Sequence, residues 1–413
     1  MKIRRTSPRR VVWTVVKGWL VAVAGIVVAL TVISKVRKLT RAHRGDGFPR
    51  TPPTEVPVSG STVITTYTYG ADLYDDMLAA IAGAKERILF ETFIFKGDET
   101  GRRFKRALIR AAERGVEVRV VYDGFANLVV RPSFLRFPAP VQVLRYPLFS
   151  GWNILNPRRW GRDHRKILVV DDTAAFVGGY NVGTEYETKW RDTHLKVEGG
   201  SVWDLDNAFV DFWNLNAHEL PMLKDRGSPS WDPYVRANRN VPRQLVFPIR
   251  NMYLEAIDRA ADRIYLTAAY FIPDHDILQA LKEARARGVD VRILVPEVSN
   301  HVVADWLSRG FYGEMLRNGV RIFRYRDAMI HAKTATIDGR WSTVGTANID
   351  RLSLSGNYEI NLEILDEDLA AHLETVFAND LKQATELTLD EWERRDIVVR
   401  ACEMILAPLR PLL

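Results

Sequence analysis

The stretch that decides the fold is "HRKILVVDDTAAFVGGYN", residues 164–181, because the chain contains its pattern twice. The second copy, "HAKTATIDGRWSTVGTAN", residues 331–348, aligns on the first without a gap. In each copy a Lys follows the His by two residues, an Asp by seven and an Asn by seventeen. One His-x-Lys alone is typical of a solvated strand end, whereas two matched copies indicate a duplicated site. The eight positions are His164, Lys166, Asp171 and Asn181 in the first copy and His331, Lys333, Asp338 and Asn348 in the second.

The sequence around the two copies is duplicated as well. "AAIAGAKERILFETFIF" and "LIRAAERGVEVRVVYD" in the first half correspond to "EAIDRAADRIYLTAAYF" and "LKEARARGVDVRILVP" in the second. Each pair reads as helix, buried strand, helix closed by Arg-Gly, and a strand rich in β-branched residues. This alternation predicts α/β layers with a largely parallel sheet. A unit of about 150 residues is too long for a stacked short repeat, so the expected fold is two fused, duplicated α/β/α sandwich units.

Shifts in composition predict where these units begin and end. We expect an N-terminal membrane anchor over residues 1–40 and a Pro- and Ser-rich linker over 41–60. The first half is predicted over 61–220, an inter-half linker rich in breakers over 221–244, and the second half over 245–390. An amphipathic segment is predicted over 391–413.

The anchor is predicted from "VVWTVVKGWLVAVAGIVVALTVIS", Val11 to Ser34, in which Lys17 is the only charged residue. A helix of these twenty-four residues would be about 36 Å long, enough to cross a hydrocarbon core of about 30 Å. The alternative is a cleaved signal peptide, but the basic "SKVRKLTRAHR" follows the apolar run in place of a small-residue cleavage site. We therefore expect a single-pass anchor in a bacterial cell membrane. Its orientation is open, because basic residues flank both ends.

Charge outside the anchor argues against a nucleic-acid partner. Residues 1–50 carry twelve Lys and Arg against one Asp, a net charge of +11. Because the total is +7, the rest of the chain carries −4. Domains that bind nucleic acid are usually basic, so we expect none to be bound. The single cysteine, Cys402, excludes an internal disulfide.

The two copies predict a phosphate site. Successive strand residues alternate between faces, so the His and Lys of each copy share one face, and two such pairs could converge on one pseudo-symmetric site. Lysine would repel a metal ion and suits a phosphate, so we expect no metal. Gly178, Gly179 and Gly345 would let the backbone approach a ligand closely. Asp192 and Glu359 each stand twenty-eight residues after a motif histidine, and we expect these carboxylates to orient the imidazoles.

These residues match the His-x-Lys-x4-Asp signature of the phospholipase D superfamily, and the sequence from about Ser61 to Leu413 resembles bacterial cardiolipin synthases. The likeness also includes "AYFIPDHDILQALKEARARGVDVRILVP", "WRDTHLKVEG" and "VGTANIDRLS". It implies two fused α/β/α units with the active site at their interface. It also implies phosphodiester chemistry without a metal or cofactor, through a covalent phosphohistidine.

The resemblance further implies a membrane-bound phosphatidyltransferase that moves a phosphatidyl group between phosphatidylglycerol molecules. His164 would attack phosphorus, and His331 would act first as general acid and then as general base. The expected partners are anionic phospholipids and the membrane, and the oligomeric state is open. The remaining signature residues divide into oxyanion-binding groups, which are Lys166, Lys333, Asn181 and Asn348, and two aspartates that hold the strand-turn geometry, which are Asp171 and Asp338.

Three other functions share these sequence features. A phospholipase D-type hydrolase would use water in place of the lipid alcohol, and the sequence hardly separates it from a transferase. A nuclease is disfavoured by the charge of −4, and a relic site by the presence of every motif residue. Two segments could meet the membrane. They are an aromatic stretch with Phe149, Trp152 and Trp160 beside Arg158 and Arg159, otherwise core under a loop, and the C-terminal segment, otherwise packed on the second half.

Overall fold

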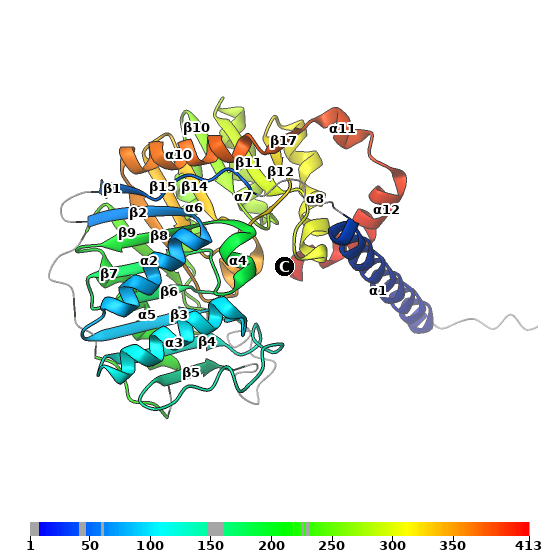
Figure 1. Cartoon of the computed structure of the whole chain (residues 1–413). Helices are drawn as coiled ribbons and strands as arrows, with labels where there is room; N and C mark the ends of the chain where they lie inside the picture. The colour runs from blue at the N-terminus through cyan, green and yellow to red at the C-terminus, as the bar shows by residue number, and fades with distance from the viewer. Residues whose placement is uncertain are drawn as a thin grey trace, which may run out of the picture.

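The computed structural model describes residues 8–40, 47–58, 62–147, 161–217, 219–224, 227 and 232–412. Two mixed sheets, one built mainly from each half, carry helices on their faces (Figure 1). The aromatic and arginine residues from Phe149 to Trp160 lie outside the described residues, so their predicted membrane role stays a prediction.

The first sheet has the strand order β1-β2-β8-β7-β6-β3-β4-β5, and β13 of the second half pairs with β8. Its strands are β1 (Thr54–Val58), β2 (Thr62–Tyr69), β3 (Arg87–Thr92), β4 (Glu117–Asp123), β5 (Gln142–Tyr146), β6 (Ile167–Val170), β7 (Ala174–Gly178), β8 (Trp190–Glu198) and β13 (Met329–Ile330).

The second sheet repeats this arrangement in the order β17-β12-β11-β10-β14-β15-β16-β9. Its strands are β9 (Val235–Asn240), β10 (Arg263–Thr267), β11 (Asp290–Pro296), β12 (Arg321–Tyr325), β14 (Thr334–Ile337), β15 (Trp341–Gly345), β16 (Glu359–Leu365) and β17 (Ala384–Leu387). The duplication read from the sequence is therefore a duplication of topology.

The expectation of largely parallel sheets is wrong. Within each half, the parallel pairs are the adjacent ones in β3-β4-β5 and in β10-β11-β12, and between the halves β13 pairs parallel with β8. The motif strand β6 runs antiparallel to β3, and β7 and β8 follow it as antiparallel neighbours. This reversal has a functional consequence, because the residues before β6 then lie beside the carboxyl ends of β3 and β4.

Helices cover both faces of the first sheet because its strand side chains alternate. In β3, Ile88 and Phe90 pack under α2 and α3, whereas Leu89 packs on the opposite face against α5. The helices are α1 (Pro8–Thr40), α2 (Gly70–Gly83), α3 (Glu99–Glu113), α4 (Thr184–Thr188), α5 (Val202–Asn216), α6 (Pro248–Arg259), α7 (His275–Ala286), α8 (Val302–Arg317), α9 (Arg351–Ser355), α10 (Glu367–Leu381), α11 (Leu389–Glu393) and α12 (Ile397–Leu406), with short 3-10 turns η2 (Pro242–Gln244) and η3 (Ala407–Leu412).

One hydrophobic cluster extends across both halves. Phe209 of α5 belongs to the same buried cluster as Ile360 of β16 and Leu373 of α10. A buried ion pair also joins the halves, because Arg191 of β8 donates to both carboxylate oxygens of Asp380 on α10 at 2.8 and 2.7 Å. Removing one partner of such a pair would leave an uncompensated buried charge, so the halves are fixed relative to each other.

Both ranges expected as linkers contribute a strand. β1 lies within 41–60 and pairs with β2, and β9 lies within 221–244 and pairs with β16. Each is the outer strand of its sheet, where a residue such as Pro57 is tolerated because the edge needs fewer backbone donors. Proline and glycine in these ranges hid the strands from sequence analysis.

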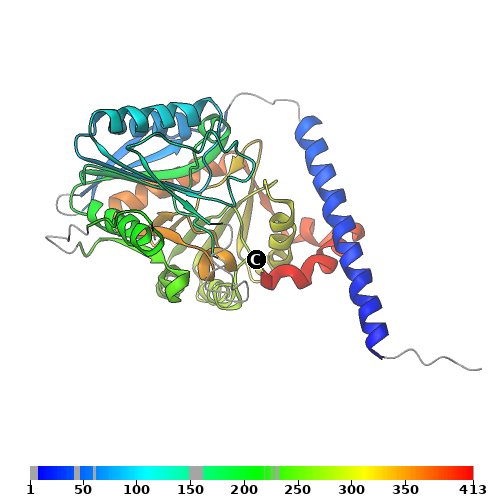
Figure 2. The same ribbon diagram turned by 90° about the horizontal axis from the view of Figure 1, so that it is seen from below.

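α1 lies along the outside of the molecule beside α12 and α8 (Figure 2). Within it, Val16–Ile33 is long and apolar enough to cross a membrane, with a mean hydropathy of 2.3 and little of its surface buried. Trp19 donates its indole N–H to the carbonyl oxygen of Ile405 at 3.0 Å, and Leu30 packs with Leu307 and Leu406.

Asp171 and Asp338 occupy equivalent turns at the far ends of the two motif strands. Each carboxylate accepts three backbone N–H groups that precede or begin the neighbouring strand, at 2.7 to 2.9 Å for Asp171 and 2.8 to 2.9 Å for Asp338. Both residues have positive φ, 50° and 53°, a region that Asp tolerates better than most residues. Burial disfavours the charged carboxylates, but the backbone donors outweigh it and lower the pKa of both.

Asp171→Ala is expected to lower the free energy of unfolding by about 2 kcal/mol, because three backbone donors lose a charged acceptor. Since the pKa of Asp171 is lowered in the folded state, its stabilisation is present above the unfolded pKa and is lost as the pH falls through the folded pKa. Thermal unfolding followed by circular dichroism at pH 7 and in acid would measure both effects. Asp338→Ala should give a matching loss, and an unchanged unfolding midpoint in both variants would contradict the assigned role.

Candidate active site

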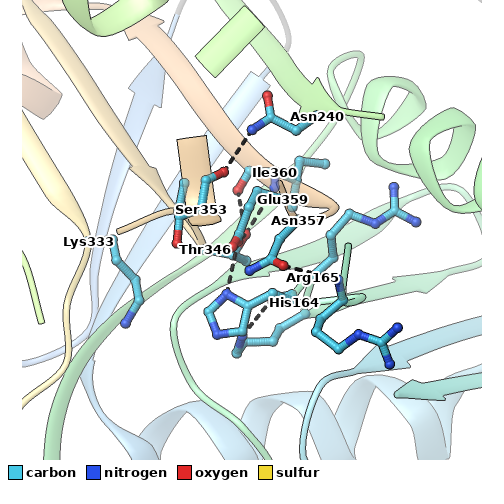
Figure 3. Close-up of polar contacts among 12 residues, drawn as sticks. His164, Arg165, Asn240, Lys333, Thr346, Ser353, Asn357, Glu359 and Ile360 are labelled. Atoms are coloured by element: carbon cyan, nitrogen blue, oxygen red, sulfur yellow. Dashed lines mark hydrogen bonds and ion pairs between the residues drawn. The ribbon is translucent and has the colours of Figure 1, made fainter. Parts of the chain in front are cut away.

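The first motif histidine is held by the second half of the chain. The backbone N–H of His164 donates to the carbonyl oxygen of Tyr358 at 3.0 Å, and Asp163 forms a parallel bridge with the same residue. The next residue on β16 is Glu359, whose Oε2 lies 2.9 Å from His164 Nδ1 (Figure 3). This backbone contact thus places the Glu359 side chain beside the His164 imidazole.

The second motif histidine is held by the first half in the same manner. The backbone N–H of His331 donates to the carbonyl oxygen of Arg191 at 2.7 Å, and β13 pairs parallel with the start of β8. Asp192 follows, and its Oδ2 lies 2.6 Å from His331 Nδ1. The carboxylates therefore pair across the halves, so that each histidine contacts the acid that lies twenty-eight residues after the other one.

Glu359 is fully buried, and a hydroxyl fixes its position. Thr346 Oγ1 donates to the same Oε2 that contacts His164, at 2.5 Å, and accepts the backbone N–H of Ile360 at 2.9 Å (Figure 3). Burial raises the pKa of Glu359 to about 8, against the opposing charge of Lys166. This side chain is therefore largely neutral at pH 7.

Asp192 has the opposite electrostatic character. Its Oδ1 accepts the backbone N–H of Thr193 at 2.8 Å, and its own N–H donates to the phenol oxygen of Tyr180 at 3.1 Å. Burial disfavours the charge, but the charge of Lys333 and the hydrogen bond from His331 outweigh it and lower the pKa of Asp192. The carboxylate beside His331 is therefore ionised.

Two motif glycines make room for side chains of the site. A Cβ at Gly179 would lie 2.0 Å from Asp192 Oδ1, and one at Gly345 would lie 2.3 Å from Asn361 Oδ1. No larger residue fits without displacing those groups. The space that was expected to receive a ligand is thus occupied by Asp192 and Asn361.

The motif lysines lie buried next to their own histidines. Lys166 Nζ donates to the carbonyl oxygen of His164 at 2.7 Å, and Lys333 Nζ donates to that of His331 and lies 2.8 Å from its Nδ1. Burial lowers the pKa of Lys166 to about 8 and that of Lys333 to about 7, although nearby carboxylates favour the charged forms. An incoming phosphate would favour the ammonium form of both.

Both imidazoles are neutral in this environment. Burial, reinforced by the lysine charges, lowers the pKa of His331 to about 3 and that of His164 well below its usual value. Aromatic rings frame them. Phe93 lies edge-on to His164 at a centroid distance of 4.6 Å, and Trp190 lies 5.0 Å from His331. A neutral imidazole whose Nδ1 faces a carboxyl group presents Nε2 for attack or proton transfer.

The other predicted residues differ in their positions and hydrogen-bond partners. Asn181 and Asn348 follow the strands that return beside β6 and β14, and both are buried. Asn181 Oδ1 accepts the backbone N–H of Ile94 at 3.1 Å, whereas Asn348 Oδ1 has no hydrogen-bond partner among the described residues. Asp171 and Asp338 lie at the far ends of the motif strands, away from the histidines.

Sequence analysis missed one buried network beside the site. Arg165, between the motif His and Lys and just before β6, is buried and donates to Glu91 Oε1 at 2.7 and 3.0 Å. Burial and the charge of Glu91 raise the pKa of Asp163 well above its usual value. The signal that could have revealed it was Glu91, a charged residue within the otherwise apolar core of the strand "RILFET".

Comparison with known proteins agrees with this geometry. The family described as "Cardiolipin synthase, PLD-like domain" matches residues 77–213 and 253–381, one match for each half. Cardiolipin synthase 1 of Bacillus anthracis is 33% identical over 383 residues, covering 86% of this chain and 74% of the relative. The chain belongs to the cardiolipin synthase family. It is therefore a phosphatidyltransferase of the phospholipase D superfamily, as the resemblance implied.

Other members of the cardiolipin synthase family and two solved structures extend the comparison. Cardiolipin synthase of Clostridium perfringens is 33% identical over 370 residues, covering 85% of this chain and 77% of the relative. Phosphatidylserine synthase of Haemophilus influenzae has a TM-score of 0.66 at 14% identity, covering 84% of this chain and 93% of that one. Polyphosphate kinase of Porphyromonas gingivalis has a TM-score of 0.53 at 14% identity, with coverages of 85% and 53%. The predicted duplicated fold is confirmed.

Glu359→Gln is expected to change how stability depends on pH. Because the pKa of Glu359 is raised to about 8, the folded protein retains a proton that the unfolded chain releases, and stability falls as the pH rises from about 4.5 to about 8. The slope is at most about 1.4 kcal/mol per pH unit. The unfolding midpoint of E359Q, measured by circular dichroism, should therefore rise relative to that of the wild type as the pH increases from 5 to 8.

The exposed Glu255 provides the control, since Glu255→Gln should shift the midpoint by the same amount at every pH in that range. Parallel pH profiles for E359Q and the wild type would show that Glu359 is ionised in the folded protein.

Proposed function

We propose that this enzyme transfers a phosphatidyl group from one phosphatidylglycerol to another through a phosphohistidine, forming cardiolipin and glycerol. The observation that carries the proposal is the crossed pairing, which gives two neutral imidazoles unlike carboxyl partners in one buried site. A nucleophile and an acid–base group need different environments, and the two pairs supply them.

The neutral carboxyl suits the nucleophile. Glu359 Oε2 accepts from Thr346 and can accept from Nδ1–H of His164, which leaves the lone pair on Nε2. His164 Nε2 attacks phosphorus, the bond from phosphorus to the glycerol oxygen breaks, and a phosphatidyl-histidine forms. Because Glu359 carries little charge, it does not favour protonation of His164, and the imidazole stays nucleophilic.

The ionised carboxylate suits the acid–base residue. Asp192 stabilises an imidazolium on His331. The bound phosphate adds a second negative charge, which raises the pKa of His331 toward neutral pH. His331 donates a proton to the departing glycerol oxygen and then takes a proton from the hydroxyl of the second phosphatidylglycerol. That oxygen attacks phosphorus, the bond to His164 breaks and cardiolipin leaves.

The remaining signature residues support these steps. In this proposal Lys166 and Lys333 hold the non-bridging oxygens, and each preorganised donor contributes on the order of 10²-fold. The amides of Asn181 and Asn348 complete the oxyanion site. Asp171 and Asp338 act at a distance by fixing the turns after the motif strands.

We propose that α1 anchors the enzyme in the bacterial cell membrane as a single span. The hydropathy of Val16–Ile33 supports this, and the packing of Leu30 on α8 and α12 favours a retained helix over a cleaved leader. The nearest alternative function is a phospholipase D-type hydrolase, in which water takes the place of the acceptor hydroxyl.

Purified full-length enzyme incubated with phosphatidylglycerol labelled in the acyl chains should yield labelled cardiolipin, with one glycerol released per cardiolipin. Thin-layer chromatography and a glycerol assay measure the two products. Phosphatidic acid as the only labelled product would assign the hydrolase.

The division of roles between the histidines is tested by changing the leaving group. His164→Ala and His331→Ala should each lower turnover of phosphatidylglycerol by about 10³-fold or more. A phosphatidyl ester of p-nitrophenol needs no protonation of its leaving group. H331A should therefore release a burst of about one p-nitrophenol per enzyme and accumulate phosphohistidine, whereas H164A should remain inactive. The reverse result would exchange the two roles.

A further inference from the structure

The loop that follows β4 presents three large apolar side chains to solvent. Within residues 124–130, called here the β4 loop, Phe125 is 56% exposed, Leu128 is 57% exposed and Val129 is 84% exposed. Exposed apolar residues are normal when scattered singly, but a cluster of this kind marks an interaction surface. Arg131 and Arg136, which follow the loop, are also exposed.

The β4 loop is attached directly to the rim of the active site. Asn127 donates to the carbonyl oxygen of Phe93 and accepts the backbone N–H of Phe95, both at 2.8 Å. The ring of Phe93 contacts His164. The apolar tip therefore lies on the rim beside the first histidine.

The opposite rim is built by the same topology and carries the membrane helix. Tyr270, whose ring centroid is 6.4 Å from that of His331, donates its hydroxyl to Asn300 at 2.7 Å, in the segment between β11 and α8. Two residues on, Ile272 packs in one cluster with Leu30 of α1. In the duplicated fold, the segment between β11 and α8 corresponds to the β4 loop.

α12 adds a second exposed apolar surface on the side of α1. Ile397 is 80% exposed, Val398 is 65% exposed and Met404 is 71% exposed, and the seven-residue spacing of the outer two puts them on one helix face. The opposite face is buried, with Leu406 packed beside α1. Both views show α12 next to α1 (Figures 1 and 2).

We propose that the β4 loop and the exposed face of α12 enter the leaflet into which α1 is anchored, so that the active site opens onto the bilayer between them. This inference rests on the proposed membrane anchoring. The occupant is a lipid bilayer with anionic headgroups, because the exposed face of α12 lies beside a helix of membrane-spanning length and both apolar surfaces are bordered by arginines. These are Arg131 and Arg136 beside the loop and Arg394 and Arg400 beside or on α12.

The arrangement would let phosphatidylglycerol reach both histidines without leaving the membrane. It would also keep bulk water from the rim of the site, which favours the lipid hydroxyl over water as the acceptor in the second step.

Membrane entry is measured with fluorescent labels on the full-length enzyme. Cys402 is first replaced by Ser, and a single cysteine is introduced at Val129, at Val398 or, as a control, at Arg259, which is 75% exposed on α6. Each protein is labelled with the environment-sensitive fluorophore NBD and reconstituted into phosphatidylglycerol vesicles. Lipids with a nitroxide on the acyl chain should quench V129C and V398C at least twofold and leave R259C unquenched.

Absence of quenching at V129C or V398C overturns the proposal. A blue shift at these positions without lipid quenching also overturns it, and assigns the surface to protein contact. Because quenching does not require turnover, insertion without cardiolipin synthesis would refute the proposed function alone, and cardiolipin synthesis without insertion would refute this inference alone.

A charge in the β4 loop gives a kinetic test. Val129→Asp should raise the apparent KM for vesicle-bound phosphatidylglycerol about tenfold or more, whereas Arg259→Asp should leave it within twofold. Equal KM values for V129D and the wild type would overturn the proposed contact.

Discussion

The active site depends on two backbone hydrogen bonds that cross between the halves. The N–H of His164 donates to Tyr358, and the N–H of His331 donates to Arg191. Each bond pairs the segment before a motif strand with the beginning of an inner strand of the opposite sheet, β16 or β8, and places a carboxylate beside the imidazole. Neither half has a complete site, because each supplies a histidine and the partner of the other histidine. The shared hydrophobic cluster and the buried Arg191–Asp380 pair hold this exchange in place.

Small differences between the halves make the two imidazoles chemically unlike. The position after the returning strand is Gly179 in the first half and Thr346 in the second. Gly179 leaves room for the ionised Asp192, whereas the hydroxyl of Thr346 donates to the neutral Glu359. A duplicated scaffold thus gives one pair suited to attack and one suited to proton transfer. Burial amplifies the difference, because removing water strengthens every nearby charge.

The same symmetry organises access to the site. Equivalent segments after β4 and β11 hold the aromatic residues that face the two histidines. One segment carries an exposed apolar tip, and the other leads into α8, on which α1 packs. A substrate with two acyl chains is insoluble as a monomer, so a site whose rim meets the bilayer removes the cost of extracting it. The exclusion of water and the supply of lipid then follow from one surface.

The sequence by itself determined the duplication, the eight motif positions, the length and apolar character of α1 and the family. These follow from local spacing and hydrophobicity, which the chain carries in order. Only the tertiary structure decided that Asp192 serves His331 and Glu359 serves His164, that Gly179 makes room for a carboxylate, and that β1 and β9 are strands. An offset along the chain states how far two residues are apart in sequence, but not which strand of the other half lies beside them. Strand pairing between halves is a non-local contact, and burial and pKa values follow from it.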